Sequence, residues 1–328
     1  MVIEKGVSMK NVDVSVVVCT HNRWAMLQEA LTGLLTQQVP QGVTYEIVVV
    51  DDGSTDNTSA VVEDIISRSS VAINHVRVER GGIPRARNRG IRAAAGKWIA
   101  FFDDDQLAEP HWLAELYGFA SERELVCVGG QRRLRLPAGA HEADLPWVCR
   151  TLLGETLDVK EPFPSHRGHF INSGNVILRR SALESVGGFD ESLQRGSDTH
   201  LVAKLRKRGI TPWYNPRAVV HHVIPTDRLE EGFLFDVSRR WGSGFALRDR
   251  EEFGLLKTVV LATARLGRAA LIDSPLLGVA LMTGDRKGAL ARRCLLSRTR
   301  GYVAGIKTLL KNALPHGRAP RSARKPLN

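Results

Sequence analysis

Three clusters of polar side chains each follow directly after an apolar run of the chain. They occupy residues 20–23, 51–54 and 103–105, and the last is three consecutive aspartates. Carboxylates that lie close together are costly unless a cation or donor groups neutralise them. Oxygen ligands favour Mg²⁺ or Mn²⁺, which commonly keep substrate phosphate oxygens in their shell. The sequence therefore predicts a divalent metal site that binds a nucleoside diphosphate.

These clusters have other interpretations. The chain has no G-x-x-x-x-G-K-[ST] motif and no G-x-G-x-x-G after its first apolar run, so neither common nucleotide-binding fingerprint is present. Residues 51–56 could instead form a turn and a helix cap, because both favour Asp, Ser and Asn. A solvated turn is the alternative for residues 103–105. Three acids directly after an apolar run favour the metal site.

The elements that must position these clusters alternate along the first half of the chain. Apolar runs predict strands, and runs with helical spacing predict helices between them. Continuous apolar strands, each followed by a helix, indicate a mostly parallel sheet that is covered on both faces. Ligands of such sheets bind at the carboxyl ends of the strands. The predicted strands are 13–19, 45–50, 71–78 and 98–102, and the predicted helices are 24–38, 59–66 and one that starts near Pro84.

The second half is less regular. Residues 131–168 hold four prolines and little periodicity, which predicts a long functional loop or an insertion. Beyond about residue 226 the chain is predicted to be helical and rich in arginine. Further strands are predicted at 124–129, 172–178 and 219–223, and further helices at 181–186 and 197–207.

Four segments together resemble the successive blocks of family 2 glycosyltransferases. They are residues 15–23, 46–56, 86–90 and 101–105, in the family's order. The resemblance covers about residues 12–245. It implies an α/β GT-A fold, in which helices flank a mostly parallel central sheet. It also implies an inverting glycosyltransferase of the hexosyltransferase type that uses a nucleotide sugar, usually with Mg²⁺ or Mn²⁺.

The resemblance also implies roles for individual residues. Asp105 would be the direct metal ligand that bridges the diphosphate, and Asp103 would face the ribose or the metal. Arg87 would lie near the base or the phosphates. The residues expected to bind the nucleotide sugar are Thr20, Asn22, Arg23, Asp51, Asp52, Arg87, Asp103 and Asp104.

Asp198 is the candidate general base. Residues 186–191 and 196–201 resemble the family's G-G-F-D-E and its later acidic motif, whose aspartate takes the proton of the acceptor hydroxyl. Ser197 stands where the family often has Glu. The alternative is that Ser197 and Asp198 cap the following helix, and Asp190 is then the second choice of base.

A histidine pair closes the last predicted strand. The resemblance implies a third metal ligand here, and adjacent side chains on a strand point to opposite faces, so at most one can serve. His222 is favoured slightly over His221. A histidine without a catalytic role is an equal alternative.

Positive charge is concentrated in the tail. The net charge is +11, and residues 285–328 hold twelve Lys or Arg against one acid, so residues 1–284 sum to zero. Amphipathic helices with a cationic face can lie on an anionic membrane. A packed helical subdomain is the alternative. Nucleic acid is not expected as a partner, because Tyr302 is the lone aromatic residue of this tail.

The predicted organisation is a catalytic domain over 1–245, a basic helical region over 246–316 and a disordered tail over 317–328. No signal peptide or membrane span is predicted, so a cytoplasmic location is expected, with peripheral membrane association as a further option. The expected reaction moves a sugar from a nucleoside diphosphate, with UDP favoured, to a hydroxyl of a glycan or lipid-linked oligosaccharide, as in cell-surface polysaccharide synthesis. The alternatives are an inactive nucleotide-sugar-binding scaffold and a metal-dependent nucleotidyltransferase.

Overall fold

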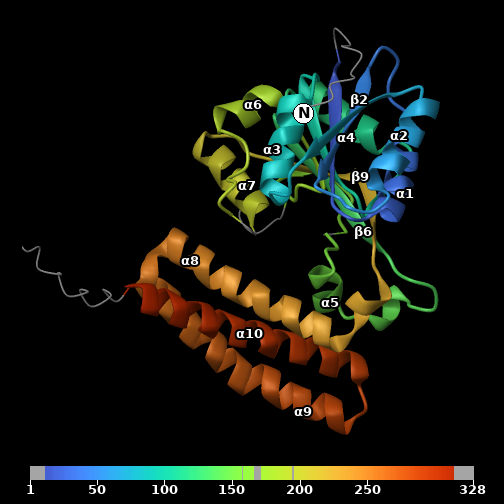
Figure 1. Cartoon of the computed structure of the whole chain (residues 1–328). Coiled ribbons are helices and arrows are strands. Elements are labelled where there is room, and N and C mark those ends of the chain that lie inside the picture. Colours follow the sequence, from blue (N-terminus) through green and yellow to red (C-terminus); the bar gives the residue numbers. More distant parts are fainter. Residues whose placement is uncertain (1–11, 157, 166–170, 194–195, 314–328) are drawn as a thin grey trace, which may run out of the picture. The chain divides into compact units, whose positions relative to one another are not determined.

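The structure is a computed structural model that describes residues 12–156, 158–165, 171–193 and 196–313 (Figure 1). The chain forms two compact units. The first consists of residues 1–139 and 154–225, and the second of residues 140–153 and 226–328.

A nine-stranded sheet forms the centre of the first unit. Its order is β3-β2-β1-β4-β8-β6-β9-β5, and β7 pairs with β9. The first four strands are mutually parallel, while β8 runs antiparallel to β4 and β6. The strands are β1 (Val14–Thr20), β2 (Tyr45–Asp52), β3 (Ala72–Val78), β4 (Trp98–Asp103), β5 (Gln106–Ala108), β6 (Cys127–Arg135), β7 (Phe163–Pro164), β8 (Asn175–Arg179) and β9 (Trp213–Val223).

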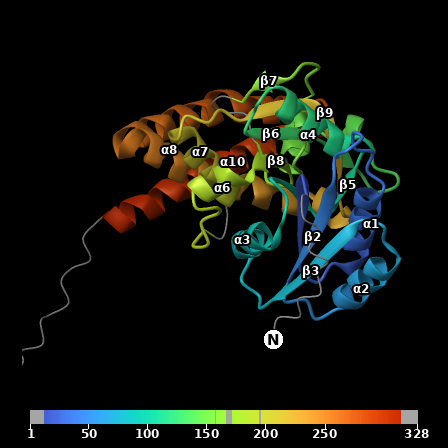
Figure 2. The same ribbon diagram turned by 90° about the horizontal axis from the view of Figure 1, so that it is seen from above.

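Helices cover both faces of this sheet, as the continuous apolar strands predicted. Alternate residues of β1 belong to two separate cores: Val16 and Val18 pack with one set of helices, and Val17 packs with the other. Figure 2 shows α1 and α2 on one side of β2 and β3, and α3 on the other. The first set is α1 (Trp24–Leu35), α2 (Thr58–Arg68) and α4 (Trp112–Glu122), and the second is α3 (Ile83–Ala93), α6 (Arg180–Ser185) and α7 (Ser197–Lys207).

The described part of residues 131–168 is more ordered than expected from the sequence. Residues 131–135 continue β6, which pairs in parallel with β9 after a register shift between Gly130 and Gln131. Residues 140–153 belong to the second unit and carry η1 (Glu142–Asp144) and α5 (Trp147–Leu152). The prolines indicated a loop, but Pro146 stands at the start of α5, where proline is tolerated. Residues 166–168 lie outside the described residues.

The second unit is helical. It contains η2 (Thr226–Leu229), α8 (Glu231–Arg268), the single π-helical turn η3 (Ala269–Asp273), α9 (Ser274–Met282) and α10 (Arg286–Ala313). Gly254 interrupts α8 with φ 77° and ψ 171°, which only glycine adopts readily, so the chain changes direction there. Helix α10 contacts both α8 and α9 and lies between them (Figure 1). Among the described residues, no helix has the length and apolarity needed to cross a bilayer.

The units divide at residue 225, whereas the boundary expected from the sequence was at 245. The reason is that the first half of α8 packs on α10: Ala246 shares one core with Tyr302 and Ile306. Helix α5 also packs on α8 and α10, and the sulfur atoms of Cys149 and Cys294 lie 3.7 Å apart. The expected disordered tail, residues 317–328, lies outside the described residues.

Glycines allow α8 and α10 to approach closely. A Cβ added at Gly301 would collide with the carbonyl oxygen of Arg239, and one added at Gly242 would collide with that of Arg298. Both obstacles are backbone atoms, which cannot rotate away. The close contact between α8 and α10 therefore requires glycine, which has no side chain, at positions 242 and 301.

Gly301→Ala is expected to lower the free energy of unfolding of the second unit by about 1–3 kcal/mol, because the added methyl overpacks this contact. The matched control is Gly278→Ala in α9, where an added Cβ meets nothing within 4 Å. The control should raise stability by up to about 1 kcal/mol through helix propensity. Urea unfolding of the whole chain, followed by circular dichroism, measures both. Equal effects of the two substitutions would contradict the close-contact interpretation.

Candidate active site

The three polar clusters meet at one edge of the sheet. Strand β1 pairs with β2 and with β4, which places Thr20 beside Asp51 and Cys19 beside Asp103. Because the three strands are parallel, their carboxyl ends coincide. The acidic residues that follow them therefore share one environment, as the sequence predicted.

Arg87 joins two of the predicted site carboxylates. Its guanidinium donates to Asp103 Oδ1 at 3.1 Å and to Asp198 Oδ1 at 3.2 Å. Its side chain, on α3, is only 8% exposed. Burial alone lowers the pKa of a guanidinium, but Asp198 and Asp103 outweigh that effect and raise the pKa of Arg87. A buried arginine that stays charged thus links residues from β4 and α7.

Asp104 and Asp105 share a second arginine. Arg23 donates to Asp104 Oδ1 at 3.1 Å and to Asp105 Oδ2 at 3.3 Å, and the Thr20 hydroxyl donates to Asp104 Oδ2 at 2.8 Å. Burial raises the pKa of Asp104 to about 6, although Arg23 and Thr20 act in the opposite direction. Asp104 is therefore held by donors from the first cluster.

Asp51, Asp52 and Asn22 take part in loop hydrogen bonds. Asp52 accepts from the backbone N–H groups of Gly81 and Gly82 at 2.8 and 2.9 Å. Asp51 accepts from the N–H of Ser54 at 2.7 Å, and Asn22 accepts from the N–H of Thr55 at 2.8 Å. Only the contact of Asp51 with Ser54 belongs to the turn that the sequence left open as an alternative, and the others join different loops. They hold the loops after β1 and β2 together beside the aspartates.

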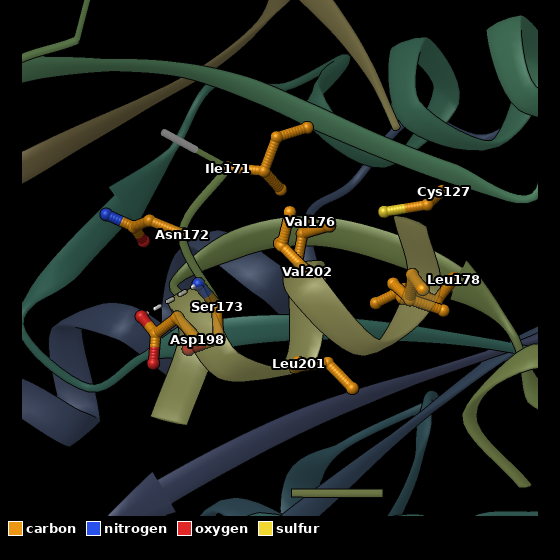
Figure 3. A pocket seen from close by; sticks show the side chains of 10 residues that line it. Cys127, Ile171, Asn172, Ser173, Val176, Leu178, Asp198, Leu201 and Val202 are labelled. Atoms are coloured by element: carbon orange, nitrogen blue, oxygen red, sulfur yellow. Dashed lines mark hydrogen bonds between the residues drawn. The ribbon is translucent and has the colours of Figure 1, made fainter. Parts of the chain in front are cut away.

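Asp198 stands at the start of α7, beside a small apolar cavity. Its Oδ2 accepts from the backbone N–H of Ser173 at 3.3 Å (Figure 3). Burial raises the pKa of a carboxyl, but Arg87 and the hydrogen bonds from Ser173 and Ser197 leave the pKa of Asp198 below its usual value. The cavity measures about 10 Å³, space for about one water molecule, so it is not a substrate pocket. Asp198 is thus an ionised carboxylate held in place.

Arg132 is a residue of this site that was not predicted from the sequence. It is half-buried on β6 and donates through Nε to the carbonyl of Gly154. Burial lowers the pKa of Arg132, and the charges of Asp103, Asp105 and Asp198 offset this effect only in part. The only sequence signal is an arginine three residues after the predicted strand 124–129, within residues that were expected to form a loop.

The two histidines of β9 contact different acidic residues, as expected for adjacent positions of a strand. His222 Nε2 lies 3.4 Å from Asp105 Oδ2, whereas His221 Nε2 lies 3.1 Å from Glu109 Oε1. Only His222 therefore adjoins the aspartates.

Two observations bear on whether a divalent cation fits here. Burial raises the pKa of Asp103, and the nearby charge of Asp105 adds to the effect, so added positive charge would be stabilised. Two buried polar atoms beside the carboxylates, Gln106 Oε1 and Ser173 Oγ, make no hydrogen bond. Within the described ranges, no group of three or more His, Cys, Asp or Glu side chains is placed to hold a metal. The residues fit a cation that takes most of its ligands from a bound phosphate and water.

Comparison with known proteins decides the family. The model for glycosyl transferase family 2 matches residues 15–187. The chain belongs to this family. It is 28% identical over 302 residues to the succinoglycan biosynthesis protein ExoM of Rhizobium meliloti, which spans 88% of this chain and 91% of that protein. It is 29% identical over 251 residues to a glucosyl-dolichyl phosphate glucuronosyltransferase of Haloferax volcanii, spanning 72% and 76%. The chain is thus a family 2 glycosyltransferase with relatives in polysaccharide and glycan biosynthesis.

Solved structures confirm the fold. The mannosyltransferase PcManGT from Pyrobaculum calidifontis, in complex with GDP-Man and Mn²⁺, aligns with a TM-score of 0.62 at 18% identity, over 92% of this chain and 90% of that chain. S. aureus TarS 1–349 in complex with UDP aligns with a TM-score of 0.52 at 17% identity, over 92% of both chains. This family 2 glycosyltransferase therefore has the predicted GT-A fold.

Arg87→Met is expected to lower the free energy of unfolding by about 1.5–3 kcal/mol, because the partly exposed Asp103 and Asp198 would lose two charged hydrogen bonds. The matched control is Arg89→Met, since Arg89 is an exposed arginine of the same helix. The control should change stability by less than about 0.5 kcal/mol. Urea unfolding without added metal compares the two, and a similar loss in both variants would disprove the role given to Arg87.

Proposed function

We propose that this glycosyltransferase moves a sugar from a nucleoside-diphosphate sugar to a hydroxyl of a glycan or lipid-linked acceptor, with inversion at the anomeric carbon. The observation that supports the proposal is that the Arg87 guanidinium contacts two carboxylates. Asp103 is suited to the donor site, and Asp198 is suited to act on the acceptor. The relatives in polysaccharide and glycan biosynthesis support the acceptor class.

The aspartates after β4 are the proposed donor site. Asp105 would be the direct ligand of Mg²⁺ or Mn²⁺, and the diphosphate and water would supply most of the other ligands. Asp103 and His222 are the proposed further ligands, although the described residues do not hold the three side chains together as a preformed metal group. The bound cation would stabilise the negative charge that builds on the departing nucleoside diphosphate. Arg23 and Arg132 would add positive charge beside it. The complex of PcManGT with GDP-Man and Mn²⁺ supports this assignment by analogy of fold.

The loops after β1 and β2 are the proposed nucleoside site. Thr20, Asn22, Asp51 and Asp52 stand at the edge of the sheet where ligands of parallel sheets bind. Their hydrogen bonds fix the shape of these loops before a ligand arrives. Preorganisation of this kind lowers the entropic cost of binding. UDP is the proposed nucleotide, and TarS supports it by analogy of fold alone.

Asp198 is the proposed general base. As the acceptor oxygen attacks the anomeric carbon from the face opposite the diphosphate, its proton passes to a carboxylate oxygen of Asp198, and the bond from that carbon to the diphosphate breaks. Asp198 is ionised and oriented by Ser173 and Arg87, so it is ready to accept a proton at neutral pH. The hydroxyl becomes acidic only as it attacks, so position matters more than basicity.

Asp198→Asn is expected to lower transfer by about 10²–10⁴-fold and to change donor affinity little, because it removes the proton acceptor and leaves the donor site intact. The control is Asp190→Asn, since Asp190 is a partly exposed carboxylate of the neighbouring loop that accepts from the N–H of Ser192. Sugar transfer and donor affinity are measured on both variants. Full turnover in Asp198→Asn would refute the assignment, and loss of turnover in Asp190→Asn alone would move the base to Asp190.

A thermal-shift screen of UDP-, GDP- and dTDP-sugars with Mn²⁺ should identify one nucleotide. A donor at a hundred times its dissociation constant should stabilise the chain by about 2.7 kcal/mol. Asp105→Ala should abolish the part of the shift that depends on Mn²⁺. The control, Asp64→Ala, changes an exposed aspartate of α2 and should keep the whole shift. A shift that survives both Asp105→Ala and chelation would rule out metal-assisted binding at this site.

The two alternatives make different products. An inactive scaffold would bind the donor and form no product, and a nucleotidyltransferase would release pyrophosphate. Release of a nucleoside diphosphate with transfer of the sugar is the outcome expected here. Analysis of the products by mass spectrometry separates the three.

A further inference from the structure

The outer helix of the second unit exposes its large apolar side chains. This helix runs from residue 255, after the break at Gly254, through η3 to the end of α9 at Met282. Leu256, Leu271 and Met282 are 82%, 80% and 82% exposed. We define the outer apolar face as Leu256, Val260, Leu266, Leu271, Leu281 and Met282.

The side of the same helix that faces the bundle is built mostly from small or polar residues, with Leu261 as a partly buried exception. The fully or almost fully buried positions follow the helical period and are Thr258, Ala262, Ala269, Asp273 and Ala280. Globular helices ordinarily show the reverse, with large apolar residues inside. Exposed apolar patches of this kind mark interaction sites, because leaving them in water costs free energy.

An ion-pair network fixes this orientation. Asp273 is buried, and its carboxylate lies 2.8 Å from Arg292 of α10 and 3.5 Å from Arg268. Rotating the helix to bury its leucines would expose Asp273 and separate it from Arg292. The apolar face is therefore held outward by the rest of the unit.

The charges on the outer helix indicate what kind of partner the outer apolar face binds. Between residues 255 and 282 the only acid is Asp273, which is buried, while Lys257 and Arg268 are exposed. Leucines beside cations suit an anionic lipid surface, where the side chains enter the acyl boundary and the cations meet head groups. A second copy of this chain would oppose cations with cations, and no exposed acid of this helix would neutralise them.

We propose that the outer apolar face docks the protein on anionic membranes, with the helix from residue 255 to residue 282 lying along the bilayer surface. At about 1.5 Å per residue the helix would contact roughly 40 Å of that surface. The inference concerns the second unit alone. It does not depend on the donor or the base proposed above.

Flotation of the full chain with lipid vesicles tests the proposal. Wild-type protein should bind vesicles of phosphatidylcholine with phosphatidylglycerol, and part of this binding should survive high salt because it rests on apolar burial. The double variant Leu271→Gln with Met282→Gln keeps the charge and should reduce the partition coefficient by at least about tenfold. Lys257→Gln should reduce it by about fivefold, in low salt only.

The matched control replaces two apolar residues that are exposed elsewhere, Ile66→Gln with Leu310→Gln, and should stay within about twofold of wild type. Thermal unfolding of all variants, followed by circular dichroism, shows that they are folded. Equal vesicle binding by wild type and the Leu271 and Met282 variant would overturn the proposal, as would a lack of binding by wild type. A wild-type dimer that this variant converts to a monomer would overturn it in favour of a second copy. None of these results bears on sugar transfer.

Discussion

The need to neutralise buried carboxylates governs the active-site edge of this protein. The end of β4 brings Asp103, Asp104 and Asp105 to one place, the start of α7 adds Asp198, and burial there favours the protonated forms of carboxylates. Arg87 and Arg23 meet that need by reaching two carboxylates each. The helix that carries Arg87, the loop that carries Arg23 and the start of α7 are all fixed by these ion pairs. The negative charge that remains around Asp103 would favour the binding of a divalent cation together with its diphosphate.

The sequence was sufficient to predict what depends on local pattern. Apolar runs predicted the strands, and the parallel arrangement followed from the helices between them, so the meeting of residues 20–23 with 103–105 could be predicted. The contact between Arg87 and Asp198 spans 111 residues, and only a family resemblance pointed to both. Arg132 was missed because it falls in residues expected to form a loop, where a charged side chain is ordinarily solvated, whereas it lies within β6. Its position beside the aspartates depends on the pairing of β6 with β9, which the sequence pattern does not show.

The helical region shows a different limit of sequence patterns. In the outer helix the buried side carries mostly small or polar residues and the exposed side carries large apolar ones, so hydrophobic periodicity would indicate the wrong side as the buried one. Cations were expected from the sequence to form the face that meets a membrane. In the structure several of these arginines are engaged with buried acids, as in the pairs of Asp249 with Arg265 and Asp273 with Arg292. Leucines occupy the outer positions instead.

The route of the chain through the second unit affects how the protein can be shortened. Residues 140–153 leave the first unit and supply α5, whose Val148, Cys149 and Leu152 are buried among helices that come from residues after 225. A truncated protein ending near residue 225 would keep this segment but lose everything that shelters it, and the exposed apolar residues would promote aggregation. A soluble catalytic fragment therefore requires two changes, truncation near residue 225 and replacement of residues 140–153 by a short polar linker.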